Sequence, residues 1–359
     1  AGELAEALFS KRQRHRIRAG HGETGTATIR AVLEALAVDH VTPPRLRDRI
    51  EANLERLHDF VVEQRLVSMD DDEVLQVIWT PPHQRGVFIA GLAAPGPLDA
   101  ANKPGLPSFY LVQPVPEDWP AAYRESFLRE YNNFMLEILS IHEAIPGHFV
   151  QLYFAKREPS KIRKILANGA FVEGWAVYAE KFMTDAGYAG LGPAPDAERP
   201  HEIPKRTWAV MQDPQLRTKA IVLHGLKFYL RSITNAILDH SIHAGSMTEE
   251  EAVNLMVQRS FQQEGEARSK WIRAQVTSTQ LSTYFVGAQA WHRLRNAARS
   301  RAGEAFDVQA FHDAALSHGA PPVHRLPELM WARPTNAEDT VAAEETSSET
   351  EPDSAEARQ

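Results

Sequence analysis

The run His142-Glu143-Ala144-Ile145-Pro146-Gly147-His148 places two imidazoles and a carboxylate close together in the chain. Apolar residues recur at three- and four-residue steps from Tyr123 to Ile141, which predicts one amphipathic helix leading into the run, with His142 on its apolar face. A neutral imidazole on a buried face beside a carboxylate has the properties of a metal ligand. Because the chain contains no cysteine, a metal must be held by His, Asp or Glu.

The two histidines stand six residues apart, whereas zinc peptidases with the pattern His-Glu-x-x-His place them one helical turn apart. Six residues of ideal helix turn through about 600°, so His148 would point about 120° away from His142. Pro146 removes a helical hydrogen bond and Gly147 permits unusual dihedral angles. We therefore predict a deformation of the helix that turns His148 back toward His142.

A third ligand is expected from a second helix, around residues 171–180. Glu173 and Glu180 share an apolar face there, and a carboxylate on such a face is costly unless it is paired or bound to a metal. We predict zinc held by His142, His148 and Glu173, with the fourth position open to water. Glu143 would be the general base, and Glu180 would bond to a histidine ring N–H.

The elements around these residues predict a mainly α protein with a small antiparallel or mixed β-sheet before the motif helix. Helical patterns cover residues 29–36 and 46–66, and helix dominates again after Tyr123. Three β-rich runs lie at 74–79, 86–90 and 108–112, with 91–107 expected to form a long loop. We expect a helical segment at 1–72, a metallohydrolase domain at 73–332 and a tail at 333–359.

The net charge of -8 is concentrated in that tail, because residues 337–359 hold eight acids and one arginine, a net of -7. This composition predicts a disordered acidic tail. The remaining residues carry about -1, so we expect no nucleic-acid partner. The apolar runs are too short for a membrane span.

Several motifs together resemble the domain of unknown function 885 family. They are the HExxPGH segment, Glu173-Gly174-Trp175 with Tyr178-Ala179-Glu180, Ser282-Thr283-Tyr284-Phe285-Val286-Gly287, and Phe311-His312-Asp313-Ala314-Ala315-Leu316 before Gly319-Ala320-Pro321. The resemblance covers roughly residues 105–331. It implies a gluzincin-type helical body similar to Taq-type carboxypeptidases and angiotensin-converting enzyme. Members of the family are commonly longer at the N-terminus, which predicts a truncated start here.

The resemblance also implies site residues. It supports zinc at His142, His148 and Glu173 with Glu143 as base, and it matches Tyr284 to a tyrosine that stabilises the oxyanion. Residues 108–112, with Tyr110, match an edge strand that holds the substrate backbone. Asp239 and His243 resemble an Asp-x-Gly-x-His element of the family, in which Ser241 replaces the glycine. This departure, and others around Arg273 and residues 278–279, affect substrate recognition rather than zinc chemistry.

The expected function is zinc-dependent hydrolysis of peptide or related amide bonds, with a peptide or small amide as substrate. Endopeptidase, carboxypeptidase and small-amide hydrolase are not separated by these residues. One alternative is a non-catalytic metal- or peptide-binding protein on a peptidase-like scaffold, and another is a purely helical interaction module. Oligomeric state is undetermined, and a chain that begins with Ala rather than Met leaves cytoplasmic and exported locations open.

Overall fold

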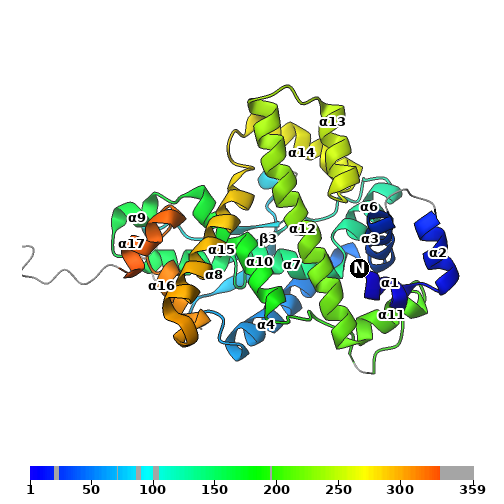
Figure 1. Ribbon diagram of the computed structural model, residues 1–359, viewed down its shortest axis with the longest axis horizontal. Coiled ribbons are helices and arrows are strands. Elements are labelled where there is room, and N and C mark those ends of the chain that lie inside the picture. Colours follow the sequence, from blue (N-terminus) through cyan, green and yellow to red (C-terminus); the bar gives the residue numbers. More distant parts are fainter. Residues whose placement is uncertain (20–23, 71, 86–89, 100–104, 195, 332–359) are drawn as a thin grey trace, which may run out of the picture.

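The computed structural model describes residues 1–19, 24–70, 72–85, 90–99, 105–194 and 196–331. These residues form a mainly helical protein with one small mixed sheet, as the sequence predicts. Figure 1 shows the long helix α12 crossing the middle of the molecule, with α13 and α14 at one end of it. The predicted acidic tail, 333–359, lies outside the described residues.

The elements before the motif run are α1 (Gly2–Leu8), α2 (Lys11–Ala19), α3 (Thr24–Leu36), α4 (Leu46–Glu63), β1 (Leu75–Trp79), β2 (Ala90–Ala93), β3 (Ser108–Val112) and α6 (Ala121–Glu130). Those from the run onward are α7 (Asn133–Glu143), α8 (His148–Arg157), α9 (Lys161–Ile165), α10 (Gly169–Asp185), α11 (Lys205–Gln212), α12 (Pro214–His243), α13 (Glu249–Asn254), α14 (Glu264–Val276), α15 (Thr283–Ala302), α16 (Val308–Leu316) and α17 (Leu326–Trp331).

The three-stranded sheet has the order β1-β3-β2, with β1 parallel and β2 antiparallel to β3. The prediction that residues 108–112 form an edge strand is therefore wrong, because β3 lies in the centre and pairs on both sides. Strand pairing is a long-range property that local composition does not reveal. β2 also takes residues 91–93 out of the predicted loop, whereas residues 86–89 of the predicted second strand lie outside the described part.

The single helix predicted from Tyr123 to Ile141 is broken into α6 and α7. The side chain of Asn132 accepts hydrogen bonds from the backbone N–H groups of Phe134 and Met135, at 3.1 and 3.2 Å. These bonds satisfy donors at the first turn of a new helix, which is the preferred role of an asparagine at this position. The apolar spacing continues across the break, so periodicity alone does not reveal it. α7 is buried from Asn133 to His142.

One hydrophobic core joins the N-terminal helices to the later ones. It contains buried residues of α1, α3 and α4 together with those of α7, α10 and α15, so the helices on both sides of residue 72 share it. α10 and α15 approach closely, because a side-chain carbon at Gly174 would lie only 2.4 Å from the carbonyl carbon of Gly287. Within the described part of the chain, every helix is too short or too polar to cross a membrane.

Candidate metal centre

The turn between α7 and α8 interrupts the helix immediately after Glu143. Gly147 allows this turn, because a β-carbon there would lie 2.0 Å from the carbonyl oxygen of His142. The indole N–H of Trp175, on α10, donates to the carbonyl oxygens of Pro146 and Gly147 at 2.9 and 3.2 Å. The predicted deformation is thus confirmed in a stronger form: the first helix ends and a second begins at His148.

This break in the helix allows the two imidazoles to come together. The ring centroids of His142 and His148 are 4.8 Å apart, with the planes at 85°. Glu173 reaches both rings from α10: its Oε2 lies 3.7 Å from Nε2 of His142 and 3.4 Å from Nε2 of His148. One ligand atom from each of these three residues lies within 4.8 Å of the other two. The structure therefore brings together the three side chains that the sequence selected.

These separations fit a small divalent cation. Ligands about 2.0–2.1 Å from zinc in a tetrahedral arrangement are about 3.3–3.4 Å from one another, close to the two His–Glu distances. Oε2 of Glu173 and Nδ1 of His148 are buried without a hydrogen-bond partner in the structure. A buried carboxylate oxygen without a donor is costly, and a cation between the rings would satisfy it.

Glu173 is held ionised in this environment. Burial by itself would raise its pKa, but the adjacent imidazoles of His142 and His148 hold the pKa of Glu173 well below its usual value. Glu180 lies on the same face of α10 but touches the opposite side of the first ring: its Oε1 is 2.7 Å from Nδ1 of His142. Nδ1 donates to this carboxylate, which leaves Nε2 free to bind a metal.

Glu143 follows His142 but its carboxylate makes no hydrogen bond or ion pair with another described residue. Burial raises the pKa of Glu143 and the charge of Glu173 adds to the rise, while His142 and His148 oppose it. A carboxylate with a raised pKa beside a group of candidate metal ligands is suited to accept and return a proton near neutral pH.

Tyr110 is fully buried on β3, close enough to Glu143 to be affected by the charge of its carboxylate. Burial and the charge of Glu143 raise the pKa of its hydroxyl well above its usual value. Its place on the central strand removes it from a substrate-binding edge, but the side chain borders the candidate base.

Tyr284 stands on the other side of the cluster, in the first turn of α15. Its ring is roughly parallel to that of His142, with centroids 6.3 Å apart. Its hydroxyl oxygen accepts from Nη2 of Arg273 at 3.3 Å and from Nε2 of Gln280 at 3.2 Å. Burial, with the charge of Glu173, raises the pKa of Tyr284 to about 12, so the hydroxyl keeps its proton and can donate it.

Asp239 and His243 contact the turn before α15 instead of the cluster. The carboxylate of Asp239 accepts from the backbone N–H groups of Thr279 and Ser282, both at 2.9 Å. His243 donates through Nε2 to the carbonyl oxygen of Ala274 at 2.9 Å. Both residues therefore shape the segment that carries Gln280 and leads into Tyr284.

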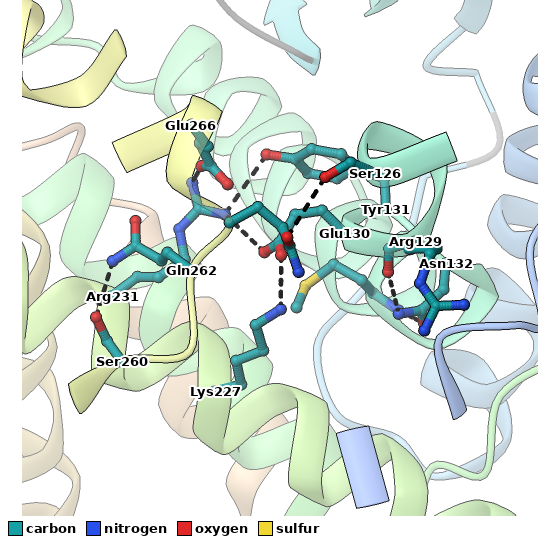
Figure 2. Close-up of polar contacts among 12 residues, drawn as sticks. Ser126, Arg129, Glu130, Tyr131, Asn132, Lys227, Arg231, Ser260, Gln262 and Glu266 are labelled. Carbon is teal, nitrogen blue, oxygen red and sulfur yellow. Dashed lines mark hydrogen bonds and ion pairs between the residues drawn. The ribbon is translucent and has the colours of Figure 1, made fainter. Parts of the chain in front are cut away.

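A buried group of charges supports α12 next to the cluster (Figure 2). Lys227 donates to Glu130 at 2.9 Å, and Arg231 pairs with Glu266. The guanidinium of Arg231 lies 5.1 Å from the ring centroid of Phe228, and this ring lies 5.7 Å from that of His142. The position of α12 therefore determines where the ring of Phe228 packs against His142.

Neither this charge group nor Gln280 was predicted from the sequence. Gln280 donates to Oε1 of Glu173 at 3.3 Å, so it bridges that carboxylate and Tyr284. The sequence feature that could have indicated Gln280 is its spacing of four residues, about one helical turn, before Tyr284. Lys227 and Arg231 also stand four residues apart, and nothing local shows that both face acids from distant helices.

The fold and the site define a class: a mainly helical protein with a small mixed sheet and a buried His-His-Glu cluster. The chain belongs to the DUF885 family, described as "Bacterial protein of unknown function", whose model matches residues 7–330. No curated protein matches it.

Two solved structures are similar to the chain. One is a candidate lipoprotein of unknown function from Shewanella oneidensis, with 32% identity and a TM-score of 0.71. The match covers 92% of this chain and 53% of that protein. The second is a candidate lipoprotein from Colwellia psychrerythraea, with 19% identity and a TM-score of 0.60. The match covers 91% of this chain and 54% of that protein. The chain thus spans about half the length of both.

Proposed function

We propose that the protein is a zinc-dependent hydrolase that cleaves peptide or related amide bonds. The observation that carries this proposal is the convergence of His142, His148 and Glu173 within 4.8 Å, with Glu143 beside them. Two imidazoles and one carboxylate are a ligand set of catalytic zinc, which keeps one position open. The likeness of the helical body to gluzincin-type peptidases is part of the same proposal.

His142, His148 and Glu173 would hold the zinc, and Glu180 would orient His142 through Nδ1. Zinc in this place supplies Lewis acidity and lowers the pKa of a water molecule. Glu143 takes a proton from the attacking water and returns it to the leaving amine. Tyr284 would donate a hydrogen bond from its hydroxyl to the carbonyl oxygen of the cleaved bond, where negative charge develops. Water's hydroxyl group ends in the new carboxylate, and its proton ends on the amine.

The test measures zinc content and cleavage of a peptide library by mass spectrometry. We expect about one zinc per chain in the wild type, and Glu143→Gln should keep zinc but lose at least about 100-fold in cleavage rate. Tyr284→Phe should also keep zinc and lose a similar factor. Glu51→Gln is the matched control, because Glu51 lies on the exposed face of α4 and, among the described residues, forms an ion pair with Arg47 alone.

Two results would count against the proposal. Cleavage by Glu143→Gln at the wild-type rate would show that the base is assigned wrongly. A wild-type protein that binds zinc and cleaves no peptide in the library would favour a non-catalytic scaffold.

A further inference from the structure

Arg273 places a guanidinium beside the candidate oxyanion donor. It lies in the last turns of α14, and its Nη2 donates to Oε1 of Gln280 at 2.9 Å and to the hydroxyl of Tyr284 at 3.3 Å. The backbone under it is fixed, because Ala274 is buried and its carbonyl oxygen is bonded to His243. The guanidinium is therefore held at the site although the residue is exposed.

The charge of Arg273 has no partner of opposite sign among the described residues. Arg268, on the same helix, pairs with Glu249 at 3.1 Å and with Glu264 at 2.7 Å. Arg273 instead uses the two N–H groups of Nη2 for neutral acceptors, so the N–H groups of Nη1 and Nε remain to donate to an anion. A divalent cation would offset two of the three carboxylate charges of Glu143, Glu173 and Glu180, and Arg273 would offset the third, so an anionic substrate would meet no net negative charge at the site.

The distances limit which anion can reach both groups. A substrate oxygen bonded to the hydroxyl of Tyr284 lies about 2.7 Å from it, so it is at most about 6 Å from Nη2 of Arg273, which is 3.3 Å from that hydroxyl. The α-carboxylate of the residue after the cleaved bond begins three bonds beyond the cleaved carbonyl carbon, at most about 4.3 Å along the chain. A side-chain carboxylate at that residue begins one bond further along in Asp and two bonds further in Glu, so the α-carboxylate is the one nearest to the cleaved bond.

We propose that Arg273 binds the α-carboxylate at the C-terminus of the substrate, so that the protein removes C-terminal residues. This inference rests on the proposed function, because it names the substrate class of the same site. The last peptide bond is cleaved: the hydroxyl group of water joins the shortened peptide as its new carboxylate, and the remaining proton leaves on the amine of the released amino acid.

The test compares N-acetylated tetrapeptides, randomised at the last two positions, as free acids and as C-terminal amides. A third set, amidated and ending in Glu, separates a side-chain carboxylate from the α-carboxylate. Binding is measured by equilibrium dialysis with the zinc-loaded Glu143→Gln full chain, which should bind without cleaving, and cleavage is measured with the wild type. The variants are Arg273→Gln, Arg273→Lys and, as matched control, Arg268→Gln.

We expect the free acids to bind and react about 10- to 100-fold better than the amides, as hydrogen bonds between charged groups allow. Arg273→Gln should bring this ratio close to one, whereas Arg273→Lys should keep part of it and Arg268→Gln all of it. The ratio isolates the carboxylate contact, because a displaced Tyr284 would slow acids and amides alike.

Equal binding of acids and amides, including no binding of either, overturns the inference, as does a ratio that survives Arg273→Gln. Amides ending in Glu that bind as well as the free acids also overturn it. Acid-selective binding that depends on Arg273, without cleavage by the wild type, would support this inference while rejecting the hydrolase. Cleavage of acids and amides alike would do the reverse.

Discussion

Glu173 and Glu180 offer a sharp test of the metal centre, because they lie two helical turns apart on α10 and touch opposite sides of His142. Glu173 faces the Nε2 atoms of both histidines, whereas Glu180 accepts from Nδ1 of His142 alone. Replacing each with Gln changes one atom and removes one charge. Any difference in zinc affinity between the two variants should therefore come from where each carboxylate lies relative to His142 and His148.

Glu180→Gln keeps an oxygen that can accept from Nδ1 but loses the charge that makes the imidazole a better ligand. Partners of this kind typically contribute 10- to 100-fold to metal affinity, about 1.4 to 2.7 kcal/mol. Glu173→Gln removes the anionic ligand itself and leaves two imidazoles, so its loss should exceed about 100-fold. Glu51→Gln should leave the affinity unchanged, because the Arg47–Glu51 pair lies on the surface of α4.

The assay is competition for zinc against a chromophoric chelator at one pH, with circular dichroism to show that each variant is folded. The expected order of affinity is wild type, then Glu180→Gln, then Glu173→Gln. Equal losses in the two variants would show that the carboxylates act as a pair. A larger loss in Glu180→Gln would reverse the assignment and make Glu180 the ligand.

Two further predictions concern the buried charges around α12. Lys227→Met leaves the buried carboxylate of Glu130 with the more distant Arg231, at 3.9 Å, so the free energy of unfolding measured in urea should fall by about 3 kcal/mol. The double variant Lys227→Met/Glu130→Met should recover most of this loss, and no recovery would contradict the pairing. Burial, with the charge of Arg231, lowers the pKa of Lys270 from its usual 10.5 to about 7, so the folded state disfavours a charge that the unfolded chain carries. The resulting destabilisation is complete below about pH 7 and is relieved as the pH rises toward 10.5. Over that range the free energy of unfolding of the wild type should rise by on the order of a few kcal/mol relative to that of Lys270→Met. Parallel curves of unfolding free energy against pH for the two proteins would refute this prediction.

The sequence was most informative where chemistry constrains a short segment. His142, His148 and Glu173 were selected because imidazoles and a carboxylate on apolar helix faces are costly without a partner, and the structure brings them together. The proline and glycine between the histidines indicated a change of direction, and the close contact of Gly147 with His142 shows why a larger residue does not fit. Zinc itself remains a prediction.

Pairing between distant segments was beyond the sequence reasoning. Residues 108–112 were identified as a strand, but their central place depends on β1 and β2 both reaching them, which no local pattern encodes. The break at Asn132 was missed for another reason. An asparagine in an amphipathic pattern fits the polar side of a continuous helix as well as it fits the start of a new one.

The buried charges show most clearly why such a site needs more than its ligands. Glu130, Arg231 and Glu266 come from α6, α12 and α14, and each alone resembles an ordinary surface residue. Apolar side chains of similar volume could stabilise the fold equally well. Hydrogen-bonded ion pairs, however, have a preferred direction, which apolar contacts lack. They therefore fix the rotation of α12, and with it the ring of Phe228 that packs between Arg231 and His142.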